Sequence, residues 1–243
     1  MKIDVCFSPA LYPYYANGGT NHIVIVVDIF RATTTMCAAL KNGAKAIIPV
    51  ASIEEAQEYK AKGYLTGAER NVKRCDFADF GNSPFDYTTD KVKDKEIVFT
   101  TTNGTQAINI SQDAEILIIG AFSNISAVAD FCTKEQKDVI ILCAGWNNRF
   151  NIEDTLFGGA LAERLISKGY TLASDATLVS LSMWQEAKSD VRNYINKSEH
   201  IKRLEANNLQ DSVDYCLTAD TIHLIPLYDK ETKQITVLDG LTQ

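Results

Sequence analysis

The residues with the clearest chemical potential form the run Thr100-Thr101-Thr102-Asn103-Gly104-Thr105, between the apolar residues 96–99 and a helical pattern. Small hydroxyl and amide side chains at such a junction leave backbone N–H groups accessible, and the following helix adds partial positive charge. The run therefore predicts an anion-binding loop, but not a nucleotide P-loop, because the glycine spacing and the lysine of that motif are absent. The predicted ligand-binding residues are Thr102, Asn103, Gly104 and Thr105.

Two further apolar runs end in the same manner. Residues 24–30 lead into Arg31-Ala32-Thr33-Thr34-Thr35, and residues 139–142 lead into Cys143-Ala144-Gly145. Because parallel strands in an α/β sheet open their carboxyl ends on one edge, where ligands bind, we expect the three junctions to meet. The sequence therefore predicts a site for a small phosphorylated anion, with Cys143 and Gly145 among its contacts.

Two pairs of an acid and an arginine follow strand-like segments. Asp28 closes one apolar run and Arg31 opens the next turn, while Glu69 and Arg70 come shortly after Gly67. A carboxylate at a strand end commonly binds a metal ion or attacks a phosphoryl group, and the planar fork of arginine binds phosphate oxygens. Structural interpretations also exist, with Asp28 capping the next helix and Glu69-Arg70 forming an exposed loop pair.

Further candidate ligands lie near the third junction. Glu153 and Asp154 begin the helix after residues 150–152, where adjacent carboxylates either complement the helix dipole or hold a hard cation such as Mg²⁺. Cys143 is either a buried, inert thiol or a nucleophile activated by a helix N-terminus. The residue types alone leave both choices open.

The turn sequence Gly81-Asn82-Ser83-Pro84 adds Asn82 and Ser83 as possible donors to a ligand, although a plain turn has the same composition. His22, His200 and His223 lie far apart in the chain, without the acidic or serine context of a catalytic triad. A histidine general base is therefore not predicted.

The elements that must position these residues alternate between strand and helix patterns, and the strands are rich in valine and isoleucine, as in sheets buried on both faces. The pattern predicts one α/β domain over residues 1–243, a three-layer α/β/α sandwich with right-handed crossovers and a mostly parallel or mixed sheet. Residues 70–95 are predicted to form a long loop, residues 171–220 a helical subdomain or cap, and residues 221–238 a closing β-hairpin. The predicted strands are residues 3–7, 23–29, 46–50, 65–69, 96–101, 115–119 and 138–143. The predicted helices are residues 33–42, 53–62, 104–111, 123–133, 152–167, 175–188 and 198–206.

Composition narrows the classes of partner. The 243 residues are 46% hydrophobic and 23% charged, which is ordinary for a globular protein, and the net charge of −7 argues against nucleic acid or an anionic membrane as partner. The six cysteines show no paired spacing typical of zinc sites or disulfide frameworks, and no apolar run has the length of a membrane span. We therefore expect a cytoplasmic protein with a small-molecule ligand; the sequence leaves homo-oligomer formation open.

Several of these motifs, in this order and at these separations, together resemble the 2-phosphosulfolactate phosphatase family, known as ComB. The resemblance extends from about residue 2 to the carboxyl end. It implies an Mg²⁺-dependent enzyme that hydrolyses (2R)-2-phospho-3-sulfolactate to sulfolactate and phosphate, a step in coenzyme M biosynthesis. The motifs that carry the resemblance are residues 28–35, Glu69-Arg70, Gly81 to Pro84, Thr100 to Thr105, Cys143 to Gly145 and Phe150 to Thr155.

On this resemblance we expect Asp28, with Glu69 or the Glu153-Asp154 pair, to anchor Mg²⁺. Arg31, Arg70 and the amides near Asn103 and Gly104 are then expected to hold the phosphoryl oxygens. The sulfonate needs donors of its own, for which the candidates are Arg149 and Asn82.

The chain departs from the family pattern in one loop, where Asn71, Val72 and Phe77 replace expected glycines. Because valine and phenylalanine rarely adopt positive φ, we expect this loop to follow a different path and substrate specificity to be less certain than reaction type. Two other interpretations remain open at this stage. One is a covalent mechanism with Asp28 or Cys143 as nucleophile; the other is a non-catalytic protein that binds a phosphorylated metabolite. The enzyme could also be a phosphatase that acts on another small 2-phospho acid instead of phosphosulfolactate.

Overall fold

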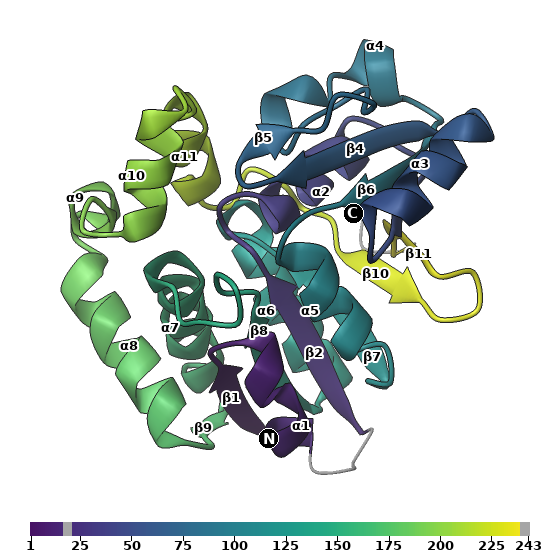
Figure 1. The fold of residues 1–243 in the computed structure, drawn as a ribbon. Coiled ribbons are helices and arrows are strands. Elements are labelled where there is room, and N and C mark those ends of the chain that lie inside the picture. The colour runs from purple at the N-terminus through teal and green to yellow at the C-terminus, as the bar shows by residue number, and fades with distance from the viewer. Residues whose placement is uncertain (17–20, 239–243) are drawn as a thin grey trace.

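The fold is a three-layer α/β/α sandwich around a large mixed sheet, as the sequence predicts (Figure 1). The computed structural model describes residues 1–16 and 21–238. Its strands are β1 (Lys2–Cys6), β2 (His22–Val27), β3 (Ala46–Pro49), β4 (Leu65–Arg70), β5 (Lys73–Arg74), β6 (Glu96–Thr100), β7 (Ile116–Gly120), β8 (Asp138–Cys143), β9 (Thr171–Leu172), β10 (Pro226–Asp229) and β11 (Gln234–Val237). Its α-helices are α1 (Tyr12–Ala16), α2 (Ala32–Lys41), α3 (Ile53–Ala61), α4 (Thr89–Val92), α5 (Gly104–Ile110), α6 (Ile125–Glu135), α7 (Ile152–Ile166), α8 (Asp175–Ala187), α9 (Val191–Ile195), α10 (Glu199–Ala206) and α11 (Asp211–Leu217). Short 3₁₀ turns are η1 (Pro9–Leu11), η2 (Pro84–Asp86) and η3 (Phe122–Asn124).

The sheet consists of two parallel groups joined by the C-terminal hairpin. Its strand order is β5-β4-β6-β3-β11-β10-β7-β2-β8-β1-β9. β11 pairs antiparallel with β3, and β10 pairs antiparallel with β7, so the last two strands lie in the middle of the sheet. The predicted hairpin is present, but it is shorter than residues 221–238, because its first strand begins only at Pro226.

Strand β2 shows how alternation of side chains builds the two cores. Ile23 and Ile25 pack in the cluster that contains residues of α6 and α7, whereas Val24 and Val26 pack with α2 and α5. All six residues of β2 are buried, because helices cover both faces of the sheet at this position. The ends of β2 and of its neighbour β8 are thereby fixed in a rigid layer.

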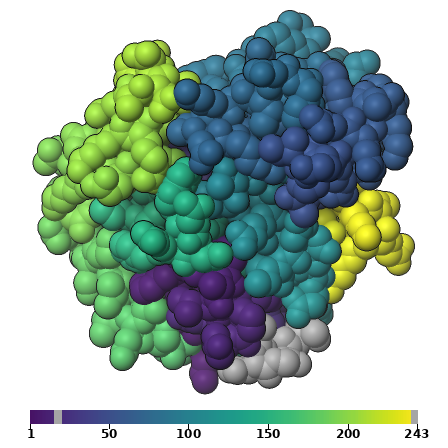
Figure 2. All heavy atoms as spheres, in the orientation of Figure 1, coloured from purple at the N-terminus to yellow at the C-terminus, as the bar shows by residue number. Residues whose placement is uncertain are grey.

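The helical stretch over residues 171–220 contains α8 to α11, of which α9 and α11 were not predicted. Ile201, Leu204 and Val213 from this stretch are buried in the same cluster as residues of β1, β2 and β8. Figure 1 shows these helices along one side of the view and the β10–β11 hairpin on the other. In Figure 2 the yellow-green surface of α10 and α11 lies beside the teal-green loop that follows β8.

Residues 70–95 are less irregular than predicted. The segment contains the end of β4, the two-residue β5, η2 and α4. Within the described parts of the chain, no helix combines the length and apolarity needed to cross a membrane.

Candidate active site at the carboxyl ends of β2, β6 and β8

Asp28 lies directly after β2 and is buried, with 7% of its surface exposed. Its Oδ1 accepts a hydrogen bond from the Ala32 backbone N–H at 3.3 Å, so the residue does cap the start of α2. Burial raises the pKa of Asp28 to about 6; His200 opposes this shift, while Glu69 and Glu153 add to it. The cap therefore uses a carboxylate that is poorly stabilised as an anion, and a cation beside it would stabilise it.

The loop after β6 reaches Asp28 through a close backbone approach at Gly104. A Cβ atom at this position would lie 2.7 Å from the Ala32 Cβ and 2.9 Å from Asp28 Oδ2. Only glycine permits this contact. The neighbouring Asn103 Oδ1 accepts a hydrogen bond from the Asn147 backbone N–H at 3.0 Å, in the loop after β8. The three predicted strand-end junctions therefore do meet, but not on one edge of a parallel sheet, because β6 runs antiparallel to β2 and β8.

Arg31 is a buried cation with an unsatisfied donor. It is 2% exposed, and its Nη1 has no hydrogen-bond partner among the described residues. Burial lowers the pKa of Arg31, and the nearby Cys216, Glu69, Asp86 and Asp28 partly offset that effect. An unpaired buried donor of this kind is costly, and an anionic ligand would remove the cost.

Glu69 and Asn82 lie together beside this arginine. The Glu69 carboxylate accepts from the Val72 backbone N–H at 2.5 Å and from Asn82 Nδ2 at 3.4 Å. Asn82 Oδ1 is buried and has no partner among the described residues. An acceptor oxygen without a partner, Asn82 Oδ1, thus lies beside the Glu69 carboxylate and near the Arg31 charge.

Arg70 turns away from this cluster. Its guanidinium donates to the Glu69 carbonyl at 2.7 Å and to Thr100 Oγ1 at 2.9 Å. Arg70 lines a separate cavity of about 370 Å³ together with the predicted anion-loop residues Thr102 and Thr105. The predicted anion loop therefore has two sides, one against Asp28 and one facing this cavity.

The hydroxyl groups of the anion loop are mostly used within the protein. Thr105 Oγ1 donates to the Thr101 carbonyl at 3.0 Å, and Thr102 Oγ1 accepts from the Asn71 backbone N–H at 3.4 Å. Thr101 Oγ1 is buried without a partner among the described residues. Of the loop hydroxyls discussed here, Thr101 is the one with unused hydrogen-bonding capacity, and the sequence analysis did not single it out.

Asp154 holds two strand ends together. Its carboxylate accepts from the Ile29 backbone N–H at 2.8 Å, from the Gly145 N–H at 3.1 Å and from Asn151 Nδ2 at 2.8 Å. Burial, followed by the charges of Asp28 and Glu153, raises the pKa of Asp154 well above its usual range. The Asp154 oxygens and the Gly145 amide are thus committed to each other, which favours a structural role for this pair over ligand binding.

Glu153 pairs with His200 from α10. The Glu153 Oε1 to His200 Nδ1 distance is 2.6 Å, and the Ser198 hydroxyl donates to Oε2 at 3.1 Å. Burial alone would raise the pKa of Glu153, but the His200 charge and hydrogen bonds outweigh it and lower that pKa. The sequence analysis gave His200 no role, because its partner is 47 residues away in the chain.

Cys143 is fully buried, and burial raises the pKa of its thiol well above the usual range. A protonated, inaccessible thiol is a poor nucleophile, so the structure favours the interpretation of Cys143 as a buried, inert thiol. Ser83 lies half-buried at the start of η2, and Arg149 is exposed on the loop after β8.

The donor set suits a hard divalent cation. In residues 1–16 and 21–238, no three His, Cys, Asp or Glu side chains form a cage that could hold a metal by themselves. Mg²⁺ does not need such a cage, because it is commonly bound by one or two carboxylates, waters and substrate phosphate oxygens. Asp28, Glu69 and the unpartnered Asn82 Oδ1 supply oxygen ligands of this kind, and the raised pKa of Asp28 is the shift that a bound cation would reverse.

Comparison with known proteins identifies the family of this chain. The family model described as 2-phosphosulpholactate phosphatase matches residues 10–231. The chain belongs to the 2-phosphosulfolactate phosphatase family. This is a family of phosphoric monoester hydrolases, and the match spans the carboxyl ends of β2, β6 and β8.

Curated relatives of the same family cover most of the chain. A probable 2-phosphosulfolactate phosphatase of Clostridium novyi is 36% identical over 238 residues, which are 96% of this chain and 100% of the relative. Proteins with the same description from Caldanaerobacter subterraneus subsp. tengcongensis and Thermotoga maritima are 37% and 40% identical, over 84% and 83% of this chain and 86% and 87% of each relative.

The loop that departs from the phosphatase family's glycine pattern nevertheless keeps a glycine-like backbone. Asn71 has a φ of 52° and Val72 a φ of 67°. The expectation that valine would avoid positive φ here was wrong. The reason is visible at Glu69, whose carboxylate accepts the Val72 N–H and so rewards the unusual conformation.

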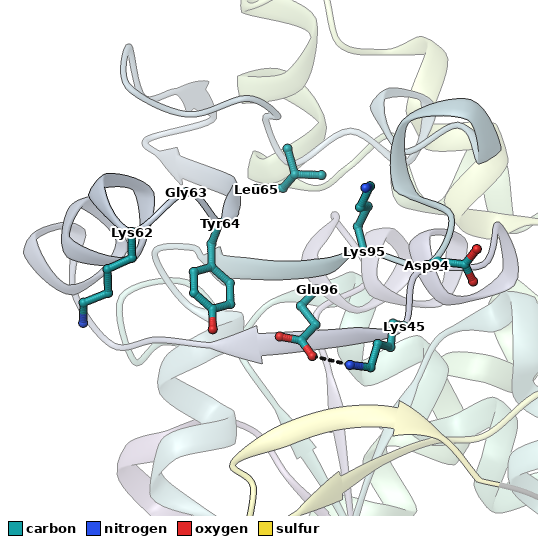
Figure 3. Close-up of a pocket in the computed structure, with 8 residues that line it drawn as sticks. All are labelled: Lys45, Lys62, Gly63, Tyr64, Leu65, Asp94, Lys95 and Glu96. Atoms are coloured by element: carbon teal, nitrogen blue, oxygen red, sulfur yellow. Dashed lines mark hydrogen bonds and ion pairs between the residues drawn. The ribbon is translucent and has the colours of Figure 1, made fainter.

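A cavity far from these residues offers a useful contrast within this phosphatase-family fold. It has a volume of about 290 Å³ and lies at the amino ends of β3, β4 and β6, whereas Glu69 and Thr100 lie at the carboxyl ends of β4 and β6 (Figure 3). Lys45 in this cavity pairs with Glu96 at 2.7 Å; the Lys45 side chain is exposed and that of Glu96 is partly buried. Its lysines lie beside no buried polar atom that lacks a partner among the described residues, so this cavity is a poorer candidate for an active site than the cluster around Asp28 and Arg31.

Proposed function

We propose that the protein hydrolyses (2R)-2-phospho-3-sulfolactate to 3-sulfolactate and inorganic phosphate in an Mg²⁺-dependent reaction, as a coenzyme M biosynthesis-type step in the cytoplasm. Family membership and the description shared by the relatives support the substrate and the reaction. The buried side-chain oxygens of Asp28, Glu69 and Asn82 support Mg²⁺ as the cofactor, because Mg²⁺ prefers oxygen ligands.

One observation carries the proposal: a buried arginine with an unpartnered donor lies beside two buried carboxylates. A protein that only stabilised Asp28 and Glu69 would gain most by pairing them directly with Arg31, yet Arg31 Nη1 has no partner among the described residues. A site for a phosphoryl group and a cation resolves this arrangement. The two carboxylates would hold the cation, and the guanidinium would bind the phosphate oxygens.

Asp28 and Glu69 would hold the cation, with Asn82 Oδ1 as a neutral ligand. Bound Mg²⁺ supplies Lewis-acid polarisation of the phosphoryl group and lowers the pKa of a coordinated water. Arg31 would bind and orient the phosphoryl oxygens and offset their negative charge as the ester bond breaks. Its burial excludes water from this contact, which strengthens the electrostatic interaction.

His200 is the proposed proton donor for the leaving alkoxide. Its Nδ1 is engaged by Glu153 at 2.6 Å, which leaves Nε2 as the ring nitrogen able to deliver a proton. The imidazole packs edge-on against the Phe30 ring, with 5.8 Å between ring centroids, so its orientation is fixed. Glu153 would act as a positioning residue that holds the imidazole in place.

The test is phosphate release from 2-phospho-3-sulfolactate and from a panel of other 2-phospho acids, with Mg²⁺ and with EDTA. We expect phosphosulfolactate to give the highest kcat/KM and EDTA to abolish turnover, with activity restored by added Mg²⁺. Turnover that is unaffected by EDTA would contradict the metal assignment. Faster hydrolysis of another 2-phospho acid would reassign the substrate, and tight binding without phosphate release would make the protein a metabolite-binding protein.

A further inference from the structure

A second cavity lies next to the cluster and is lined by cationic and aromatic side chains. It has a volume of about 330 Å³, at the low end for small-molecule sites, and lies between the loop after β8 and the start of α10. The lining residues that matter for its chemistry are Trp146, Arg149, Phe150, Lys197, His200 and Arg203. A basic cavity is notable in a chain with a net charge of −7.

Arg203 is held in place without an acidic partner. Its guanidinium carbon lies 4.1 Å from the centroid of the Trp146 ring, within the range of a cation–π contact. Its Nε is buried and has no hydrogen-bond partner in the described parts of the chain, where no ion pair of Arg203 is found either. A planar cation fixed on an aromatic ring with donors to spare is preorganised to bind an oxyanion.

The other charges at this cavity do not cancel Arg203. Glu199, the acidic residue of the lining, pairs with Lys202 at 2.6 Å. Lys197 is 3.7 Å from Glu186 and lies over the Tyr194 ring. Arg149 and Arg203 therefore remain as the two guanidiniums of the cavity that have no acidic partner among the described residues.

The cavity adjoins the catalytic cluster through two residues. His200 lines it and binds Glu153, and the centroids of the His200 and Trp146 rings are 5.6 Å apart. Asn147, next to Trp146 in the chain, donates its backbone N–H to Asn103 at the end of the anion loop. A three-carbon substrate with its phosphate at Arg31 would thus have its far end close to this cavity.

We propose that this cavity is the sulfonate subsite, in which Arg203 on Trp146 and Arg149 bind the sulfonate oxygens and so select phospho acids with a second strong anion. The inference rests on the proposed function, because it assigns the far end of the same substrate. A sulfonate is charged at every physiological pH and presents three equivalent oxygens, which suits two guanidiniums with unused donors. His200 separates this subsite from the phosphoryl subsite.

The decisive variant is Arg203→Gln, assayed with 2-phospho-3-sulfolactate and with 2-phospholactate, which lacks the sulfonate. We expect the variant to lose about 100-fold in kcat/KM for phosphosulfolactate, mainly through KM, because the half-buried guanidinium that faces the sulfonate is removed. We expect less than a twofold change for 2-phospholactate. Arg203→Lys, which keeps the charge but not the planar fork, should recover part of the loss.

A matched control is Lys202→Gln, one residue earlier on the same helix, where the side chain is exposed and faces Glu199. This variant should behave as wild type with both substrates. Binding of 3-sulfolactate, measured by calorimetry without any reaction, should weaken about 100-fold in Arg203→Gln and about tenfold in Arg149→Gln, with unchanged melting temperatures.

Equal losses on both substrates, or no loss on either, would overturn the sulfonate subsite while leaving the phosphatase activity standing. Absence of phosphate release from both substrates by the wild-type enzyme would instead overturn the proposed function. If that occurs, the calorimetric comparison of 3-sulfolactate with lactate still tests the cavity, since lactate lacks the sulfonate and should not distinguish Arg203→Gln from wild type.

Discussion

Two buried acidic pairs of the candidate site have opposite surroundings. Every carboxylate oxygen of Glu153 and Asp154 accepts a hydrogen bond from the protein. Around Asp28 and Glu69, in contrast, polar atoms of Arg31 and Asn82 are buried with no partner in the described residues.

This difference separates scaffold from binding site more clearly than burial does, because all four carboxylates are buried. Carboxylates at a helix start whose oxygens all accept hydrogen bonds hold strand ends and neighbouring helices together. A buried guanidinium donor and a buried amide oxygen without partners, in contrast, lower the stability of the protein. From the sequence, Asp28 was expected to hold Mg²⁺ together with either Glu69 or the Glu153-Asp154 pair. The hydrogen bonds favour Asp28 and Glu69.

The largest effect is expected from Asp28→Asn. The amide keeps the size of the side chain but removes the charge that we assign to the metal, so kcat for phosphosulfolactate should fall by at least about 1,000-fold, equivalent to about 4 kcal/mol. Phosphate release with excess Mg²⁺ measures this effect. Activity within tenfold of wild type would contradict the assignment of Asp28 to the metal, because Asp28 would then be no more functional than the Glu153-Asp154 pair.

The same variant has a stability signature that serves as its control. The pKa of Asp28 is raised from 3.8 to about 6 on folding, so the native state binds the extra proton between these values. In EDTA, the contribution of Asp28 to wild-type stability should therefore be largest below about pH 4 and fall by about 3 kcal/mol as the pH rises to about 6. Asp28→Asn should lack this part of the pH dependence, and urea denaturation of both proteins at pH 4 and pH 7 measures the difference.

Asp154→Asn tests the other pair. Both Asp154 oxygens accept hydrogen bonds, and the amide group of asparagine would point N–H groups at one set of donors. We expect the free energy of unfolding to fall by about 3 kcal/mol, which corresponds to a decrease in Tm of about 6–12 °C for a domain of this size.

Asn151→Ala is the matched control for Asp154→Asn, since it removes one donor and leaves the two backbone donors in place. It should cost only about 1 kcal/mol. If Asp154→Asn left the Tm unchanged but abolished Mg²⁺-dependent activity, Asp154 would belong with the binding pair and the contrast drawn here would fail.

The layers of the fold were predictable because its main signals are local. Apolar strands alternate with amphipathic helices, and the caps are readable: Ser52 accepts the Glu55 N–H at 3.1 Å, at the start of the predicted helix over residues 53–62. The strand order was not predictable. β10 and β11 enter the middle of the sheet through long-range pairing with β7 and β3, which no local pattern encodes.

The candidate site was predictable to the extent that its residues follow strands. Asp28, Asn103 and Glu153 are marked by that position, and the parallel strands and the loop after β6 bring their segments together. His200 and Arg203 carry no such mark, because they come from α10, and their position depends on packing of the 171–220 stretch against the sheet. Such residues become visible only when the tertiary structure is known.

Val72→Gly should have the smallest effect. It tests whether the backbone is strained beside Glu69, in the pair of acids that we assign to the metal. Valine at a φ of 67° is strained by about 1–3 kcal/mol, and glycine relieves this strain while adding about 0.5–1 kcal/mol of chain entropy to the unfolded state. We therefore expect a gain of about 1 kcal/mol in the free energy of unfolding, measured by urea denaturation.

Asn71→Gly is the control, since asparagine tolerates its φ of 52° and little strain remains to be relieved. The backbone N–H that holds Glu69 survives both changes, so activity should be unaffected. A loss of stability in Val72→Gly would mean that the valine side chain contributes more through packing than its backbone costs.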